Sequence, residues 1–157
     1  KEGIEIVSMP EIRWHRRDIK SISLLAQCIL KHEAHKAGAY ECFLIEDGLV
    51  TECSSSSAFI IKDDVLITRP LSNDILPGIR RKVILGLAEQ AGLRVEQRAF
   101  GMSEVYEADE AFISAATLMV LPIVKADGRQ VGGGAVGKYV PRLREMYAAR
   151  LRAEAGL

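Results

Sequence analysis

The sequence predicts an α+β fold, in which flanking helices cover a mostly antiparallel, barrel-like sheet. Strand-like segments outnumber segments with helical periodicity. Two-residue turn signals, of which Asp47-Gly48 and Asp127-Gly128 are the clearest, join several strands into hairpins. The chain has 157 residues, 48% of them apolar and 27% charged, which suits one domain with its own core. We therefore expect a single domain over residues 1–157, without internal repeats.

The beginning of the chain predicts one strand followed by one long helix. Residues 4–9, with the strand-like Ile4-Glu5-Ile6-Val7 at their start, are expected to form a strand, and Pro10 ends it. A helix is predicted from about residue 19 to residue 36, because apolar residues recur there at helical spacing. Asp18 is the expected N-cap of this helix, and Gly38 lies just past its end.

The middle of the chain predicts hairpins and a second helix. Four strands are expected as two hairpins, over residues 40–46, 49–52, 58–61 and 65–68. A helix is expected over residues 79–91, where Gly78 opens it and Gly92 ends it.

Short strands and helices alternate in the last third of the chain. The expected strands cover residues 93–100, 111–115 and 119–125, and the expected helices cover residues 103–108 and 140–153. Ser103 is the expected cap of the short helix, which lacks the acidic partner of a capping box at Tyr106.

The charge pattern argues against nucleic acid and membrane partners. Lys+Arg and Asp+Glu both number 21, so the net charge is near zero and no basic patch is indicated. No apolar run approaches the roughly 20 residues that a membrane span needs.

The three cysteines, Cys28, Cys42 and Cys53, are widely spaced and form no zinc-binding pattern with the histidines. We expect reduced, mostly buried thiols, no metal site and a cytoplasmic protein.

Lys20 is a candidate nucleophile at the predicted start of the first helix. Arg13, Arg16 and Arg17 precede it closely, and the first turn of a helix carries partial positive charge. Together with partial burial, these features would favour an uncharged amine that can condense with an aldehyde. A solvated surface lysine is the alternative interpretation.

Glu52 is a candidate partner for a cationic ring nitrogen, because it ends a strand and precedes four serines. The alternative is an ordinary carboxylate at the edge of a polar loop. The serines, Ser55 among them, offer hydroxyl and N–H groups to a ligand, although such a run is also typical of a solvated loop.

Two further segments could approach an anion. In "ILPGIRR", Gly78 would allow the N–H groups of Ile79 and Arg80 to face a phosphate at a helix N-terminus, and a guanidinium can add two parallel bonds. In "FISAATLMVLP", the small residues Ala115 and Ala116 end a strand and leave room for a ligand. A plain loop-to-helix junction and tight packing are the respective alternatives.

Taken in order, these segments resemble the class IV (fold type IV) pyridoxal-phosphate enzymes. The resemblance rests on "DIKS", "DGLVTECSSSS", "ILPGI" and the strand that ends in small residues before a proline, and it spans essentially the whole chain. The family includes D-amino acid aminotransferases, branched-chain aminotransferases and aminodeoxychorismate lyases. "IRWHRRDIKS" is most similar to the D-alanine aminotransferase branch.

The resemblance assigns roles to individual residues. It implies that Lys20 binds pyridoxal 5'-phosphate covalently and moves a proton during catalysis, and that Glu52 contacts the pyridine nitrogen. Leu76 would pack on the ring, and the turn through Gly78 to Ile79 and Arg80 would bind the phosphate. The other cofactor-binding positions that it implies are Ser55, Ala115 and Ala116.

The sequence departs from the family pattern at four positions in or beside these segments. The family's usual glycine after the glutamate is Cys53, which cannot freely adopt a positive φ. Its usual asparagine after the serines is Ser57. Two hydroxyl residues near the phosphate are replaced by Arg80 and Ala116.

The implied function is transfer of an amino group from an amino acid, of the D-amino acid or branched-chain type, to a 2-oxo acid. A lyase acting on aminodeoxychorismate and a non-catalytic family member are the alternatives. The resemblance also implies a homodimer. It implies that the chain is the large, cofactor-binding domain, that the family's amino-terminal small domain is absent, and that the chain alone would transaminate poorly.

Overall fold

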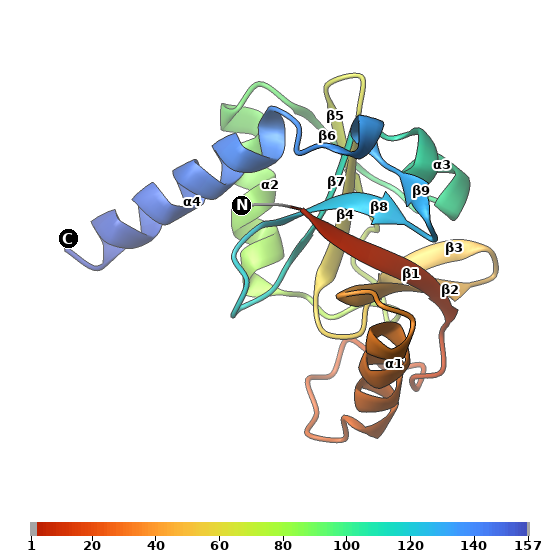
Figure 1. The fold of residues 1–157 in the computed structure, drawn as a ribbon. Helices are drawn as coiled ribbons and strands as arrows, with labels where there is room; N and C mark the ends of the chain where they lie inside the picture. Colours follow the sequence, from red (N-terminus) through yellow and green to blue (C-terminus); the bar gives the residue numbers. More distant parts are fainter. Residues whose placement is uncertain (1–2, 157) are drawn as a thin grey trace.

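The computed structural model describes residues 3–156, which form a curled mixed sheet with flanking helices (Figure 1). The strands are β1 (Ile4–Pro10), β2 (Glu41–Glu46), β3 (Leu49–Cys53), β4 (Ser57–Lys62), β5 (Val65–Thr68), β6 (Arg94–Gln97), β7 (Glu110–Ser114), β8 (Leu121–Ala126) and β9 (Arg129–Gln130). The helices are α1 (Leu25–Lys36), α2 (Ile79–Gln90), α3 (Met102–Glu107) and α4 (Tyr139–Glu154), with a 3-10 turn at Gly132–Gly134.

The sheet has the strand order β3-β2-β1-β8-β7-β4-β5-β6, and β9 pairs with β8. Most neighbouring strands run antiparallel, which confirms the predicted fold class. Parallel pairs join β1 to β2, β1 to β8 and β5 to β6, and the sequence did not predict them. Two of these pairs follow from crossover helices, because α1 connects β1 to β2 and α2 connects β5 to β6. The pair of β1 and β8 instead joins strands from opposite ends of the chain.

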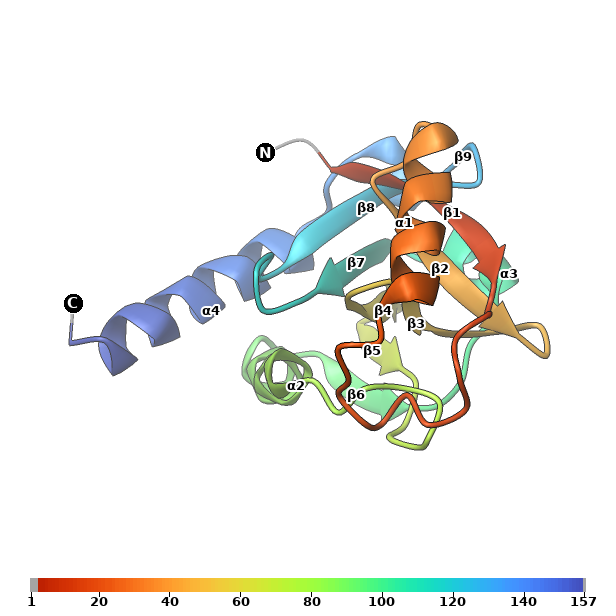
Figure 2. The same ribbon diagram turned by 90° about the horizontal axis from the view of Figure 1, so that it is seen from below.

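The sheet is buried on both faces. Side chains alternate along β4, so that Ile60 joins a cluster with Phe43 and Val50, while Phe59 faces the helices and stacks on Phe112 at 4.6 Å between ring centroids. Helices α2 and α4 pack together on the second face, and α1 covers β1 and β2 (Figures 1 and 2). Burial on both faces explains why several strands are nearly continuous apolar runs.

The first helix begins later than the sequence predicts. Helix α1 starts at Leu25, and residues 11–24 form an irregular loop. Asp18 does not cap a helix, because its carboxylate accepts hydrogen bonds from Arg16. The periodic apolar residues before α1 do not face a core, since Ile22 is 99% exposed. The prediction of a helix from residue 19 was therefore wrong.

Smaller differences occur in the last third of the chain. Helix α3 is capped at Gly101 and not at Ser103, where the sequence predicted the cap. The Gly101 N–H donates to the Glu104 carboxylate at 3.3 Å, so the cap does have an acidic partner. Strand β6 covers only part of the predicted range 93–100. Strand β8 begins after Met119, which has a positive φ of 55°. The remaining elements lie where they were predicted, within a few residues.

The prediction that the cysteine side chains are buried is confirmed for two of the three. Cys42 and Cys53 are fully buried, whereas Cys28 is exposed, and all three are free thiols. Within residues 3–156 there is no helix long and apolar enough to cross a membrane. The same residues hold no cluster of side chains that could bind a metal ion.

Candidate functional site

The candidate site lies where two long loops meet at one end of the sheet. The first loop, residues 11–24, follows β1, and the second, residues 69–78, precedes α2 (Figure 2). A backbone hydrogen bond joins them, because the Arg17 N–H donates to the Asn73 carbonyl at 2.9 Å. The chain therefore brings the segment of Lys20 and the segment of Leu76 to the same region.

Glu52, at the end of β3, is the buried acid of this region. Its Oε1 accepts a hydrogen bond from Arg13 Nη1 at 2.6 Å, and the Leu76 N–H lies 3.3 Å from both carboxylate oxygens. The residue is only 6% exposed. Burial raises the pKa of Glu52, while Arg13 and the Leu76 N–H act in the opposite direction.

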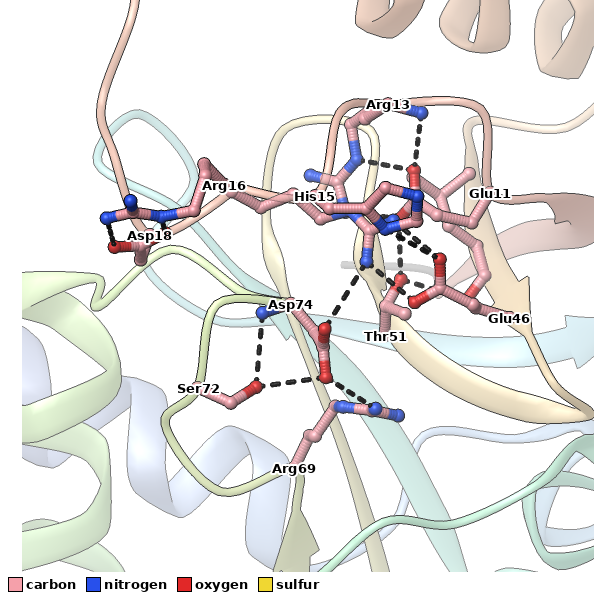
Figure 3. A network of polar contacts seen from close by, with 12 residues as sticks. Glu11, Arg13, His15, Arg16, Asp18, Glu46, Thr51, Arg69, Ser72 and Asp74 are labelled. Atoms are coloured by element: carbon pink, nitrogen blue, oxygen red, sulfur yellow. Dashed lines mark hydrogen bonds and ion pairs between the residues drawn. The ribbon is translucent and has the colours of Figure 1, made fainter.

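Arg13 is held between two carboxylates. Its Nε and Nη2 donate to Glu11 at 2.9 and 2.6 Å (Figure 3), and its Nη1 donates to Glu52 at 2.6 Å. Glu11 also accepts a hydrogen bond from the Thr51 hydroxyl at 2.8 Å. The pKa of Glu11 is lowered, because the hydrogen bonds and the charge of Arg13 outweigh the effect of burial.

The other two arginines near Lys20 are also paired. Arg17 donates to both oxygens of Glu46 at 2.9 and 2.7 Å, and its Nη1 lies 3.8 Å from Asp74. Arg16 forms a two-bond pair with Asp18 (Figure 3). The three arginines were expected to disfavour the charged form of Lys20, but carboxylates neutralise each of them. Two of these guanidinium groups are buried, and buried charges need partners.

Lys20 itself lies in the irregular loop and not in a helical turn. Its side chain is exposed, and its amine forms no hydrogen bond or ion pair with other residues in the range 3–156. Close by, a cavity of about 240 Å³ opens between the loop and α1 and is lined by Arg13, Trp14, Ser21, Ser23, Ala26 and Gln27. Lys20 is not one of these lining residues, and the partial burial expected for its side chain was wrong, because the loop leaves it exposed.

The N-terminus of α2 offers unpaired donors for an anion. Gly78 is its N-cap, in extended conformation and without a side-chain cap, so the first N–H groups of this helix have no partner within the helix. A side chain at position 78 would lie 3.5 Å from the Ser57 hydroxyl. Two buried polar atoms, Ser56 Oγ and Arg80 Nη1, have no hydrogen-bond partner among residues 3–156. The uncapped N–H groups at the start of α2 fit a phosphate group.

Arg80 also packs against an aromatic ring. The centre of its guanidinium lies 5.0 Å from the Tyr147 ring centroid, which is a cation–π contact with α4. Its neighbour Ile79 is 78% exposed, and Leu76 is half-buried.

The serine loop is anchored by a carboxylate that sequence reasoning missed. Glu41 is fully buried and accepts hydrogen bonds from the hydroxyls of Ser54 at 2.6 Å and Ser55 at 3.2 Å. Lys31 lies 3.3 Å from the same carboxylate. The Ser55 hydroxyl therefore donates to the protein, and its backbone N–H is the group left for a ligand.

The two alanines follow strand β7 toward the same edge. Ser114, the last residue of β7, pairs with Ser57 in the sheet, and Ser57 adjoins Gly78. Ala115 is half-buried and Ala116 is exposed. The register thus places this strand end near the N-terminus of α2.

Cys53 does not strain the backbone. It is absent from the positions with positive φ, and its side chain is fully buried in the core. Burial raises the pKa of the Cys53 thiol well above its usual range, so the thiol is a packing group. The missing glycine at this position therefore carries no conformational cost here.

Comparison with known proteins identifies the family. The model of the family "Amino-transferase class IV" matches residues 2–126. The chain belongs to the class IV aminotransferases. The D-alanine aminotransferase of Bacillus licheniformis is 41% identical over 137 residues, which are 87% of this chain and 48% of that protein. The D-alanine aminotransferase of Listeria monocytogenes (strain 10403S) is 39% identical over 155 residues, 99% of this chain and 54% of that protein.

Solved structures agree with this class IV aminotransferase fold. The branched-chain amino acid aminotransferase of Escherichia coli superposes with a TM-score of 0.83 at 28% identity, covering 94% of this chain and 52% of that one. The PLP form of the branched-chain enzyme from Thermobaculum terrenum gives a TM-score of 0.87 at 27% identity, covering 96% and 52%. The chain spans about half the length of the relatives it matches.

Within this class IV aminotransferase chain, sequence reasoning found the segments but missed the groups that hold them. The link from Arg13 to Glu52 and the buried Glu41 were not predicted. Both had a weak signal, since Glu41 directly precedes the apolar residues 42–45 of β2 and Arg13 follows Glu11 by two positions.

Proposed function

We propose that this chain binds pyridoxal 5'-phosphate and forms the cofactor-binding part of an aminotransferase, which moves an amino group from an amino acid to a 2-oxo acid. One arrangement carries the proposal: the Leu76 N–H holds the buried carboxylate of Glu52, two residues before the open N-terminus of α2. Membership of the class IV family supports it. So does the Thermobaculum terrenum relative, whose solved structure is described as the PLP form.

Each residue has a distinct task in this proposal. When bound, pyridoxal phosphate supplies an electrophilic aldehyde and a ring that withdraws electrons from the substrate. Lys20 Nζ would hold the aldehyde carbon and afterwards move the proton at the substrate Cα. Glu52 would accept a hydrogen bond from the protonated ring nitrogen. Leu76 would pack against the ring.

The phosphate would lie at the α2 N-terminus. The backbone N–H groups of Ile79 and Arg80 would donate to it, and Gly78 leaves that approach open. Ala115 and Ala116 would leave room beside it, and the Ser55 N–H adds a further donor.

The substrate class that we propose is D-amino acids. Support comes from the curated relatives, because D-alanine aminotransferases reach 41% identity while the branched-chain aminotransferase structures reach 28%. A branched-chain substrate is the second candidate, favoured by the TM-scores of 0.83 and 0.87.

Borohydride trapping tests the proposal on the complete natural polypeptide that carries this sequence. Reduction in the presence of pyridoxal phosphate should label a single peptide, the one that contains Lys20. The Lys20→Ala variant should be unlabelled and inactive, whereas Lys36→Ala, which removes another exposed lysine at the end of α1, should be labelled normally. Labelling elsewhere, or none in the unmodified protein, would contradict the proposal.

A substrate panel separates the alternatives. D-alanine, L-leucine and aminodeoxychorismate would each be offered, the amino acids together with a 2-oxo acid. Turnover of D-alanine supports the proposed class, turnover of L-leucine the branched-chain class, and release of pyruvate from aminodeoxychorismate a lyase. A Lys20→Ala variant that kept its full biological activity would indicate a non-catalytic family member.

We further propose a cytoplasmic homodimer. Apolar side chains are exposed on α1 and the loop before it, with Ile22 at 99%, Leu25 at 75% and Trp14 at 51% exposure, and such a patch favours a protein contact. The free thiols suit a reducing compartment. Light scattering on the purified complete polypeptide would give a mass of two chains, and Ile22→Ser should lower it.

A further inference from the structure

We propose that Arg13 is a positioning residue of this site, which fixes the orientation and the charge of Glu52. The inference rests on the proposed function and deepens it, because it concerns the group that would face the ring nitrogen. Arg13 lies seven residues before Lys20 and would itself touch neither cofactor nor substrate.

Hydrogen bonds to two carboxylates fix the orientation of the Arg13 guanidinium. Its guanidinium uses Nε and Nη2 on Glu11 and Nη1 on Glu52, so each of its three nitrogens has a carboxylate partner. Glu11 is fixed in turn by the Thr51 hydroxyl at 2.8 Å and by Arg17 Nε at 3.5 Å. A rigid planar fork held in this way determines where Glu52 Oε1 lies.

The second oxygen of Glu52 remains available. Oε1 accepts from Arg13 at 2.6 Å and lies 3.3 Å from the Leu76 N–H, whereas Oε2 has only the Leu76 N–H at 3.3 Å among residues 3–156. A carboxylate oxygen has room for two donors. The arrangement therefore directs one oxygen to the protein and leaves the other for a ligand N–H.

The charges favour a cationic ligand at this oxygen. One guanidinium lies between the buried carboxylates Glu11 and Glu52, so these three side chains taken alone carry one negative charge. The next guanidinium, Arg17, lies 3.5 Å from Glu11 but makes its hydrogen bonds with Glu46. The groups that face Glu52 are Arg13 and Glu11 from the loop after β1 and the Leu76 N–H from the loop before α2. Burial and Glu11 raise the pKa of Glu52, and Arg13 and Leu76 lower it, so loss of Arg13 favours the uncharged acid.

The test compares Arg13→Gln with Arg17→Gln in the complete polypeptide. Both remove a buried arginine of the same loop, but the partners of Arg17 among residues 3–156 are Glu46, Asp74 and Glu11, and not Glu52 itself. Arg13→Gln should lower kcat about tenfold or more and move the acidic limb of the kcat–pH profile to higher pH. Arg17→Gln, which leaves both side-chain hydrogen bonds from Arg13 to Glu11 in place, should move the acidic limb less than Arg13→Gln does, although it lowers the melting temperature. Arg13→Lys, which keeps the charge, should recover part of kcat.

A double-mutant cycle shows whether Arg13 acts through Glu52. In a Glu52→Gln background, Arg13→Gln should cause little further loss of kcat, because the group it acts on is gone. Equal pH profiles for the Arg13 and Arg17 variants, or additive losses in the cycle, would overturn the inference. If Arg13→Gln does not fold, Arg13→Lys takes its place in the same comparisons.

Carboxyl titration separates this inference from the proposed function. Carbon-13 NMR of the glutamate side chains, with Glu52 assigned through Glu52→Gln, needs no cofactor and no turnover. Glu52 should titrate at higher pH in Arg13→Gln than in the unmodified protein. A shift without any cofactor binding would retain the link between Arg13 and Glu52 but reject the aminotransferase proposal, whereas an unchanged titration rejects the link itself.

Discussion

At the scale of single residues, buried ion pairs give the loop of residues 11–24 a fixed shape without a helix. Arg13 and Arg17 are 8% and 4% exposed, and each meets carboxylates from β2, from β3 or from the chain just after β1. Removing one partner of a buried pair leaves an uncompensated charge, which is far more costly than the pair is stabilising. These arginines therefore determine local structure more than the apolar residues between them do.

The pair of Arg17 and Glu46 should make stability depend on pH. The hydrogen bonds from Arg17 are the main cause that lowers the pKa of Glu46. A carboxyl group with a lowered pKa stabilises the folded state above its unfolded pKa, and the contribution disappears as the pH falls through the folded pKa. The unfolding free energies of the unmodified protein and Arg17→Gln should thus differ at pH 7 and converge below about pH 4.

Urea unfolding at a series of pH values measures this difference. Arg142→Gln, which removes an exposed arginine of α4, is the matched control and should follow the unmodified protein throughout. A gap between the unmodified protein and Arg17→Gln that stays constant down to pH 3 would contradict the ion-pair explanation.

At the scale of elements, helix α4 has two different halves. Val140, Leu143 and Tyr147 are buried against the sheet and α2, whereas the later turns extend away from the body of the molecule (Figure 1). Leu143 is fully buried, and Leu151, two turns later, is 37% exposed. Only the first half contributes to the core.

Leu143→Ala should therefore lower the free energy of unfolding by about 2–4 kcal/mol, since it removes a buried side chain and leaves a cavity. Leu151→Ala, the same substitution in the same helix, should change it by less than about 1 kcal/mol. Denaturant unfolding of both variants is the measurement, and similar losses would mean that the second half of α4 is also packed.

The sequence predicted elements well where a hydrophobic pattern ends in strong turn signals. The hairpin of β4 and β5 and the start of α2 after Gly78 are examples. The prediction from sequence failed for residues 19–24. Apolar residues recur there at helical spacing, but the ion pairs of the preceding arginines hold the loop in an irregular conformation. The candidate residues were predictable from motif order, but the side chains that hold them in place were not. Arg13 and Glu52, for example, are 39 residues apart, and nothing in the local sequence indicates their contact.

At the scale of the whole molecule, the candidate site draws on distant parts of the chain. Residues around positions 20, 52, 78 and 115 come from different connections of one sheet. A ligand that contacts all of them would hold these connections together and would bind only the folded protein.

Pyridoxal phosphate should accordingly raise the melting temperature. At a concentration about 100 times its dissociation constant, the gain is about 2.7 kcal/mol, or several degrees for a chain of this size. Thermal unfolding with and without the cofactor measures the shift. Lys20→Ala should reduce it, and inorganic phosphate should produce a smaller one. Equal shifts for the two ligands would point to the anion site alone.

The ion pairs of the arginines also determine which peptide bonds of the loop after β1 a protease can cleave. A protease specific for basic residues must draw several residues of an extended substrate into its cleft. Arg13 and Arg17 cannot be drawn out without breaking their ion pairs, whereas Arg16 and Lys20 are exposed. Brief digestion with trypsin should therefore cut this loop after residue 20 rather than after residue 16, whose bond joins it to the buried Arg17, and a ligand bound at Lys20 should protect the cut bond.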